Sequence, residues 1–308
     1  VEIDKDQVLN YFKNSHVGIN STIYKGIYSL PPGHYLICKN KRLYLKKYWS
    51  KPLIDSSYIL NKENKLNIKK LLIDSLDRQL DADVDVGLFL SGGVDSSLLL
   101  SLSKNLKKNL KTFSFTFFED DNDDLKYLNK LTEKFSTKHY NFDLNNIDIL
   151  DEIKEIQIIQ DEPFSDSSFL PLYILSKNAS NHVKSVITGD GADEIFLGYT
   201  NWYSRIHEII KYKILNEIPL ISKFLKTLNI FENKSFFKYL CINLDSRNSS
   251  DIFSYTMSPF TSKKLQKLGL LDNPNNKFDL KKYSSKELLD IFRNEILETY
   301  LTGDILTK

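Results

Sequence analysis

LFLSGGVDSS, residues 88–97, is the stretch that decides how this 308-residue chain folds. A short apolar run (84–90) leads into it, a glycine pair turns the chain, and helical spacing of leucines resumes at 95–108. Gly92 and Gly93 let the backbone approach an anion and offer unpaired N–H groups. Further donors at the start of the helix, where the dipole favours negative charge, are the hydroxyls of Ser91, Ser96 and Ser97. The stretch therefore predicts a phosphate-binding loop between a buried strand and a helix.

Asp95 carries a negative charge inside this predicted anion site. An aspartate fits there when it holds a cation, which suggests Mg²⁺ bridging to the phosphates. The loop is not a Walker loop, because no lysine follows the glycines and the G-x-x-x-x-G-K-[ST] spacing is missing. Six fixed residues in the pattern S-G-G-x-D-S-S arise by chance about once in 10⁷ positions, so the pattern is specific.

Strand and helix patterns alternate on both sides of this loop. Buried strands are predicted at 84–90, 111–118, 138–144 and 184–189, with helices at 95–108, 124–136, 146–160 and 168–180. Such alternation predicts an α/β fold, a parallel sheet with helices on both faces. Beyond about residue 194 the pattern is mostly helical, with helices expected at 201–215, 220–230, 233–243, 260–270 and 285–300.

The first 50 residues differ from the rest of the chain. Residues 22–49 show short alternating stretches, a turn at Pro31-Pro32-Gly33 and a second turn near Lys39-Asn40, which predicts strand, turn, strand. From about residue 56 the leucines take helical spacing. We therefore place a domain boundary between residues 50 and 51.

A second acidic segment, ITGDGADEIFLGY (187–199), follows the last predicted strand. Asp190, Asp193 and Glu194 crowd three carboxylates at the carboxyl edge of the sheet, where ligands of open α/β sheets bind. Three carboxylates so close together repel one another unless a metal ion or a cationic substrate neutralises them. Taken by itself, the segment is also explained by a helix that Asp190 caps at its N-terminus. A third segment, QDEPFSDSSFLP (160–171), holds Asp161, Glu162 and Asp166 and by itself is typical of a solvated loop.

Composition excludes several classes of protein. Lys+Arg is 42 and Asp+Glu is 40, and only five of the basic residues are arginine, so neither a nucleic-acid coat nor a polybasic membrane surface is expected. No run approaches the roughly 18 apolar residues that span a bilayer. Cys38 and Cys241 are far apart in the sequence, which favours reduced thiols in a cytoplasmic protein over a disulfide or zinc site.

Residues 88–97 resemble the PP-loop of the ATP pyrophosphatase superfamily, which cleaves ATP between the α and β phosphates. Together, S-G-G-V-D-S-S, D-E-P-F-S-D-S-S and G-D-G-A-D-E-I-F-L-G-Y closely resemble the glutamine-dependent asparagine synthetase family. The resemblance implies a sheet of the adenine nucleotide α-hydrolase-like (HUP) type over residues 51–308. Residues 1–50 resemble the end of that family's Ntn-type glutaminase domain.

The resemblance implies an ATP-dependent ligase. Aspartate and ATP would give β-aspartyl-AMP and pyrophosphate, and ammonia released from glutamine would attack the adenylate to give asparagine. The same motif match implies that AMP and pyrophosphate are contacted by Ser91, Gly92, Gly93, Ser96 and Ser97. It also implies that Mg²⁺ is bound by Asp95 and Asp193. It makes Asp190 and Asp193 the catalytic carboxylates, Asp190 orienting substrate or accepting a proton from ammonia. Leu90 and Phe115 would flank adenine, which the backbone of Gly189 would approach.

Some positions depart from the family pattern. The family's glutaminase nucleophile is an N-terminal cysteine, whereas this chain starts at Val1, and a lysine motif of the family lies beyond Lys308. We therefore expect a fragment shortened at both ends, without glutaminase activity and with weak or no ligase activity. Leu197 replaces a glycine of the family's F-G-G-Y, which we expect to change a helix contact and leave the ATP chemistry intact.

Alternatives stay open at this point. A paralogue on the same scaffold would use another acid, as sugar-acid amidotransferases, β-lactam synthetases and peptide cyclases do. A PP-loop enzyme acting on tRNA is disfavoured by the +2 net charge and the few arginines. A non-catalytic nucleotide-binding relic is disfavoured by the intact Asp95, Asp190 and Asp193. The expected partners are small molecules, with no nucleic acid and no membrane, and a homodimer is left open.

Overall fold

A computed structural model describes residues 1–52, 61–107, 109–116, 123–143, 147–204, 260, 262–270 and 284–308. The chain divides into two compact units, which are described separately. Unit 1 comprises Val1–Trp49, Gln160–Asp166 and Gly191–Thr307, and unit 2 comprises Ser50–Ile159, Ser167–Asp190 and Lys308. The helices expected at 220–230 and 233–243, and most of the one expected at 201–215, lie outside the described residues.

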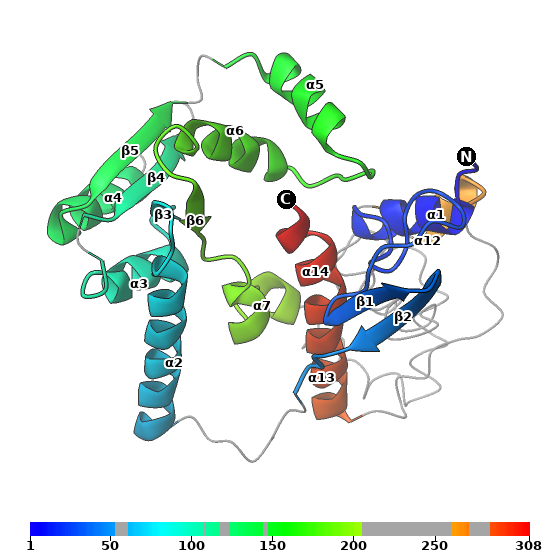
Figure 1. Ribbon diagram of the computed structural model, residues 1–308, viewed down its shortest axis with the longest axis horizontal. Coiled ribbons are helices and arrows are strands. Elements are labelled where there is room, and N and C mark those ends of the chain that lie inside the picture. The colour runs from blue at the N-terminus through cyan, green and yellow to red at the C-terminus, as the bar shows by residue number, and fades with distance from the viewer. Residues whose placement is uncertain are drawn as a thin grey trace, which may run out of the picture. The chain divides into compact units, whose positions relative to one another are not determined.

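Unit 2 is built on a four-stranded sheet with the order β5-β4-β3-β6 (Figure 1). The strands are β3 (Val86–Phe89), β4 (Lys111–Thr116), β5 (Lys138–Asp143) and β6 (Ser185–Ile187). Every neighbouring pair runs parallel, with Leu88 opposite Thr112 on one side and Ile187 on the other. All four residues of β3 are buried, as expected of a central strand covered on both faces.

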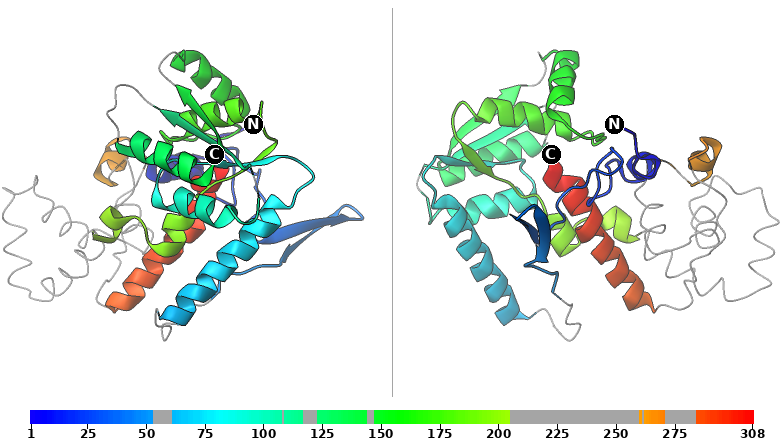
Figure 2. Two further views of the ribbon diagram at one scale, coloured as in Figure 1. Left: turned by 90° about the vertical axis from the view of Figure 1, so that its left-hand side faces the viewer. Right: turned by 45° about the vertical axis from the view of Figure 1, so that its right-hand side comes forward.

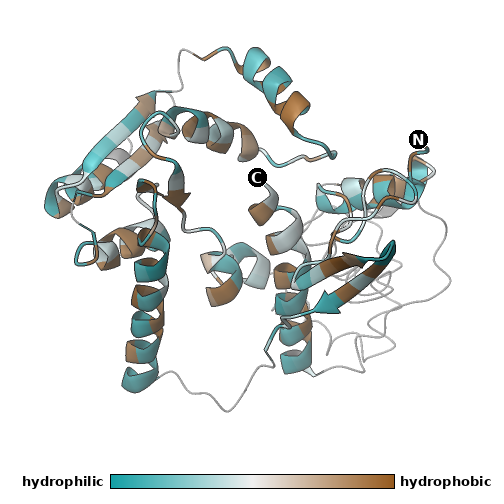
Figure 3. Ribbon diagram, viewed as in Figure 1, coloured by the Kyte–Doolittle hydropathy of each residue, from teal (hydrophilic) through white to brown (hydrophobic). Residues whose placement is uncertain are grey.

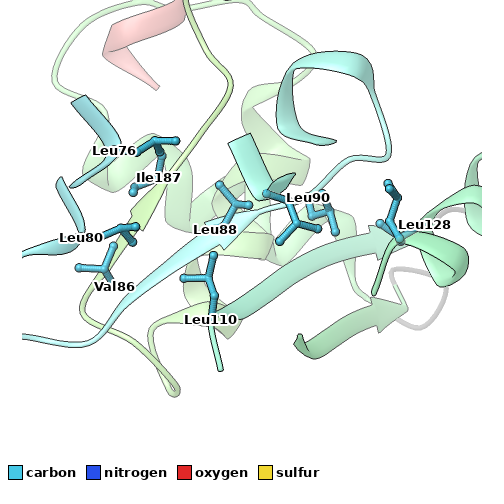
Figure 4. Packing of buried hydrophobic residues seen from close by; sticks show 10 residues of the cluster. Leu76, Leu80, Val86, Leu88, Leu90, Leu110, Leu128 and Ile187 are labelled. Carbon is cyan, nitrogen blue, oxygen red and sulfur yellow. The ribbon is translucent and has the colours of Figure 1, made fainter. Parts of the chain in front are cut away.

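Helices cover both faces of this sheet, which confirms the predicted fold class. One face carries α2 (Lys62–Leu80), α3 (Val94–Ser103) and α4 (Asp123–Phe135), whose leucines pack on β3 and β6. Figure 4 shows Leu76 and Leu80 of α2 beside Val86, Leu88 and Ile187. These two leucines are four residues apart and so lie on one side of α2, whereas most of that helix is hydrophilic (Figure 3).

The opposite face of the sheet is aromatic and packs on α6 (Phe169–Ala179). Phe113 is fully buried there, its ring stacked 5.3 Å from Tyr140, with Leu175 and Ala179 of α6 in the same cluster. Outside α6 lies α5 (Ile149–Ile159), attached by ion pairs from Lys177 to Glu152 and Glu155. Burying one large apolar side chain contributes about 1.5–3 kcal/mol to the free energy of unfolding. These two clusters are therefore the main source of stability in unit 2.

Unit 1 begins with a helix and a hairpin. The helix α1 (Lys5–Asn14) starts where the side chain of Asp4 accepts the N–H of Asp6, and the sequence pattern had not indicated it. The hairpin pairs β1 (His34–Lys39) with β2 (Arg42–Lys47), as predicted. Asn40 and Lys41 both have positive φ, at 52° and 61°, and such two-residue turns match the twist of paired strands.

The alternating stretch before Pro31 does not form a strand. Local hydrogen bonds take its place, because the hydroxyl of Thr22 donates to the carbonyls of Tyr24 and Ile27 and the Ile27 N–H donates to Tyr24. These bonds close a turn over 22–27 and use groups that a partner strand would need. Within this stretch, the described residues form one isolated antiparallel β bridge, between Ile3 and Tyr24.

The C-terminal helical run of unit 1 is continuous in Figure 2. It starts with α13 (Ser285–Glu295), where Ser284 and Glu287 form a reciprocal capping box. A π-helical turn (Ile296–Tyr300) follows, then α14 (Leu301–Gly303) and a short 3₁₀ turn (Ile305–Thr307). The shorter helices α7 (Ala192–Phe196) and α12 (Ser262–Lys267) complete the described part of the unit. Among the described residues, no helix combines the length and the apolar content that crossing a membrane requires.

Candidate nucleotide site

The loop after β3 has the geometry of an anion site. Leu90 is 1% exposed and its N–H donates to the carbonyl of Phe113 at 2.8 Å, so the sheet fixes the chain up to this point. Gly92 then takes φ +82°, a left-handed conformation that glycine adopts without strain. Gly93 is the N-cap of α3, and no side chain caps the helix start. The first N–H groups of α3 therefore remain available to an anion.

Two serine hydroxyls hold this loop in shape. Oγ of Ser96 accepts the Ser91 N–H at 3.2 Å, lies 3.0 Å from Oγ of Ser91, and donates to the carbonyl of Gly93 at 3.3 Å. Oγ of Ser91 in turn accepts the Gly93 N–H at 3.2 Å. Ser96 is 6% exposed, so its hydroxyl supports the turn from inside.

Ser97 differs from the other two serines. Its Oγ is buried and has no hydrogen-bond partner within the part of the chain that the structure describes. A buried hydroxyl without a partner is unfavourable, and such atoms in native proteins call for an explanation. An oxygen-rich group bound at the start of α3 would supply one, so this orphan hydroxyl fits a phosphate ligand.

The loop after β6 lies directly against the loop after β3. A Cβ placed on Gly189 would be 3.3 Å from Cβ of Asp95 and 3.4 Å from the N of Ser96. The parallel register of β3 and β6 produces this proximity, because it pairs Val86 with Ser185 and brings both carboxyl ends to one edge. Asp190 follows immediately, with its N–H 3.4 Å from Oγ1 of Thr188. Unit 2 therefore gathers Asp95, Ser96, Gly189 and Asp190 at one edge of the sheet.

The two predicted adenine neighbours lie on the strands beside this edge. The side chain of Leu90 packs in the leucine cluster of the α2, α3 and α4 face (Figure 4). Phe115, one residue before the end of β4, is half-buried against the aromatic cluster under α6. The side chains of Leu90 and Phe115 pack on opposite faces of the sheet. That they flank adenine remains a prediction.

The rest of the acidic segment belongs to unit 1, and one of its carboxylates is buried there. Gly191 has φ +88° and starts α7. Glu194, in the first turn of α7, is 1% exposed, and the hydroxyl of Tyr199 donates to its Oε1 at 2.5 Å. Burial, followed by the bond to Glu194, raises the pKa of Tyr199 well above its usual value. Sequence patterns had grouped Glu194 with the other carboxylates and gave no sign of this burial.

Leu197 ends α7 in a strained backbone conformation. Its φ is +63° and its ψ +42°, in the left-handed region where a side chain meets steric resistance. The family glycine expected at this position would adopt that conformation freely. The structure thus shows where the departure acts, namely at the C-cap of α7 in unit 1.

The third acidic segment is not a solvated loop. Oε2 of Glu162 accepts the Ile23 N–H at 2.8 Å, and Phe164 forms a β bridge with His16. The Ser165 N–H also donates to the carbonyl of Ser15 at 2.9 Å. Residues 160–166 therefore anchor the N-terminal segment of unit 1, because backbone groups of that segment would otherwise lack partners.

The expected Mg²⁺ ligands, Asp95 and Asp193, belong to different units, so their pairing stays a prediction. Within the described ranges no cluster of three or more His, Cys, Asp or Glu side chains could hold a metal ion. Carboxylate oxygens are nevertheless the ligands that Mg²⁺ prefers, and it keeps several waters when bound by one or two of them. Asp95, half-buried beside the S-G-G turn, suits that mode of binding.

A family model described as asparagine synthase matches residues 67–299. A putative glutamine-hydrolysing asparagine synthetase of Methanocaldococcus jannaschii is 29% identical over 97% of this chain and 60% of its own length. Asparagine synthetase 1 of Bacillus subtilis is 30% identical over 71% of this chain and 34% of its own. An amidase, chyE, of Penicillium rubens is 29% identical over 58% and 31%.

The chain thus spans 60% or less of the length of these curated relatives. Among solved structures, the ammonia-dependent NAD synthetase of Campylobacter jejuni aligns with 76% of this chain and 95% of its own. That alignment has a TM-score of 0.35 and 15% identity. The loop geometry and the family match over residues 67–299 lead to one conclusion. This chain belongs to the asparagine synthase family.

Proposed function

We propose that this chain is the ATP-using part of an amide-forming ligase that activates aspartate as β-aspartyl-AMP and releases pyrophosphate. Ammonia derived from glutamine then attacks the acyl carbon of the adenylate, so that asparagine forms and AMP leaves. The observation that carries the proposal is the meeting of the loops after β3 and β6, with Gly189 against Asp95 and Ser96. One loop offers uncapped helix N–H groups for phosphates, and the other brings a carboxylate to the same edge.

Each residue has a role in the proposed reaction. A carboxylate is a poor electrophile at neutral pH, so its oxygen must first attack the α phosphate, with pyrophosphate leaving. The N–H groups at Gly92 and the start of α3 would stabilise the charge that grows on pyrophosphate. Mg²⁺, held by Asp95 and Asp193, would neutralise part of the same charge when bound. Asp190 would orient the acceptor or take the proton that ammonia loses on attacking the acyl carbon.

We also propose that residues 1–50 belong to the glutaminase part of the enzyme and 51–308 to the ATP-binding part. The hairpin β1–β2 supports this division, since Leu36, Leu43 and Leu45 are 48%, 67% and 51% exposed. Two-stranded sheets are marginal by themselves and need a packed face. A sheet of a preceding glutaminase domain would supply that face.

The acceptor acid has a second candidate class. This class is a paralogue that amidates another carboxylic acid, and the similarity to an amidase, at 29% identity, is the observation that favours it. The S-G-G loop cannot separate the two, because it contacts only the nucleotide. Acid-dependent pyrophosphate release separates them, with aspartate compared against a panel of other carboxylic acids and ammonium chloride as the nitrogen source.

Nucleotide binding tests the proposal directly. The 308-residue chain is titrated with ATP in the presence and absence of Mg²⁺ by calorimetry. We expect Mg²⁺-dependent binding, and we expect Asp95→Asn to weaken it by about tenfold or more, since a carboxylate ligand to the metal is lost. Asp143→Asn, at the carboxyl end of edge strand β5, is the matched control. A folded chain that binds no ATP, or an Asp95→Asn variant with unchanged affinity, would count against the assignment.

A further inference from the structure

Glu194 is a carboxylate that the proposed chemistry leaves without a role. It follows Asp193 directly in α7, yet its side chain is 1% exposed while Asp193 is half-buried. A buried carboxylate is costly unless hydrogen bonds compensate for its lost hydration. The hydroxyl of Tyr199 provides one, at 2.5 Å from Oε1. The two neighbouring acids therefore face different surroundings within unit 1.

Tyr199 belongs to an aromatic cluster, defined here as Tyr199, Trp202 and Tyr300. The ring centroids of Tyr199 and Trp202 are 4.0 Å apart. Tyr300 meets both rings edge-on, at 5.9 Å from Tyr199 and 5.2 Å from Trp202. Edge-to-face and offset aromatic pairs add stabilisation beyond burial and fix ring orientation. The cluster thus links the residues that follow α7 to the C-terminal helical run.

The backbone of the C-terminal run is shaped at the point where Tyr300 enters the cluster. Residues Ile296–Tyr300 form a π-helical turn inside an otherwise α-helical stretch. Such turns insert one extra residue, are rare, and occur often at functional sites. Leu301, just after the turn, packs near Gly191 at the start of α7, with Cδ1 3.5 Å from where a Cβ would lie. Both ends of α7 are therefore held by the same run.

We propose that Glu194 is a positioning residue: with Tyr199 and the aromatic cluster it anchors α7 so that Asp193 is held in one orientation. Glu194 itself contacts neither metal nor substrate. The proposal rests on the proposed function for the task of Asp193, whereas the anchoring contacts stand on unit 1 geometry alone. A direct ligand role would require the Glu194 carboxylate to be accessible, and at 1% exposure it is not.

Fluorescence of Trp202 tests the anchor without any activity. The chain has two tryptophans, so Trp49→Phe leaves Trp202 as the single reporter, in contact with Tyr199. We expect Glu194→Ala to shift Trp202 emission to longer wavelength and to raise its quenching by acrylamide, because the cluster opens to water. We expect Glu194→Gln to keep the parent emission, since its amide oxygen still accepts the Tyr199 hydroxyl. Unchanged emission in Glu194→Ala would overturn the anchor.

Function separates positioning from direct ligation. For Mg²⁺-dependent ATP binding and acid-dependent pyrophosphate release, we expect Glu194→Gln to stay within about threefold of the parent and Tyr199→Phe to lose about tenfold, the equivalent of one hydrogen bond. Asp193→Asn, which leaves the aromatic cluster untouched, should lose more and keep Trp202 emission. If Glu194→Gln loses as much as Asp193→Asn and needs more Mg²⁺, Glu194 acts directly and the proposal fails.

The two proposals fail in different ways. A parent chain that binds no ATP, but whose Trp202 emission responds to Glu194→Ala and is retained in Glu194→Gln, would contradict the proposed function and support the anchor. A parent chain that binds ATP normally, with Trp202 emission equal in the parent, Glu194→Ala and Glu194→Gln, would support the function and overturn the anchor.

Discussion

The carboxylate of Asp193 occupies the space where a side chain at position 198 would begin. A Cβ on Gly198 would lie 1.6 Å from Oδ1 of Asp193 and 3.1 Å from its Cα. No side-chain rotation of residue 198 avoids this overlap, because Cβ is fixed by the backbone. The glycine is therefore needed for the packing of the acid. It directly follows Leu197, a position where the family resemblance also leads us to expect a glycine.

Gly198→Ala should displace Asp193 and destabilise unit 1. We expect a loss of about 1–3 kcal/mol in unfolding free energy from overpacking. A displacement of the acid near 1 Å can reduce activity about 100-fold, so acid-dependent pyrophosphate release should fall more than stability does. The double variant Asp193→Ala/Gly198→Ala should recover stability and leave activity low. Additive losses in the double variant would show that the overlap is relieved elsewhere.

Leu197→Gly should stabilise the chain. Left-handed backbone costs a non-glycine residue about 1–2 kcal/mol, and the greater freedom of unfolded glycine takes back about 0.5–1 kcal/mol. Leu197 is 43% exposed, and the loss of its remaining burial offsets part of this gain. A net gain of up to about 0.5 kcal/mol in urea unfolding is expected. Ile195→Gly, in the helix body, is the control and should destabilise; a loss at both positions would refute the strain argument.

Gly303→Ala should disrupt the packing of His16 in unit 1. A Cβ on Gly303 would lie 2.3 Å from Cε1 of His16, whose side chain is buried and whose Nδ1 is bonded to the Val17 carbonyl at 2.6 Å. We expect about 1–3 kcal/mol of destabilisation from this clash. His16→Ala/Gly303→Ala should be more stable than the sum of the single variants predicts, as thermal unfolding would measure.

Acid should weaken unit 2 through His139. Desolvation lowers the pKa of His139, with an opposing contribution from a hydrogen bond with the Thr112 backbone. The unfolded side chain titrates near pH 6.5, so as pH falls below about 6.5 the unfolded state binds a proton before the folded state does. Stability should be complete above that pH and decrease as pH falls toward the lowered folded pKa.

Urea unfolding between pH 5 and pH 7 measures this loss, and His139→Gln should flatten it. Glutamine can still bond to Thr112 and Ser114, whose hydroxyls lie 2.9 and 3.1 Å from the ring nitrogens. His16 is also buried, and desolvation lowers its pKa. The unfolding free energy of unit 1 should therefore still depend on pH in the His139→Gln variant. An unchanged slope of unit 2 in His139→Gln would exclude His139 as its source.

The sheet and its helices could be predicted because their information is local. Runs such as Val86–Phe89 are apolar throughout, and Leu76 and Leu80 repeat at helical spacing, so period and length settle the element type. The S-G-G loop was equally visible, since its glycines and serines are contiguous. The role of Ser96 could not be predicted, because a serine whose hydroxyl supports a turn and a serine that contacts phosphate look the same in the sequence.

Long-range contacts escaped the sequence patterns. Glu162 bonds to Ile23 across 139 positions, and nothing near either residue specifies the other. The burial of Glu194 was hidden for the same reason, since a charged residue gives no hydrophobic periodicity to read. The alternating stretch before Pro31 forms no strand because the Thr22 hydroxyl bonds to nearby carbonyls, a competition that side-chain patterning does not register.

Unit 1 is composed of three stretches of chain, and its first stretch depends on its last through His16 and Gly303. A ribosome makes His16 well before Gly303, because most of unit 2 lies between them in the sequence. At about 5–20 residues per second, residues 1–49 wait roughly 13–50 seconds for Gly303 while unit 2 is synthesised. Co-translational folding of unit 1 is therefore delayed until the whole of unit 2 that lies between these two residues has been synthesised.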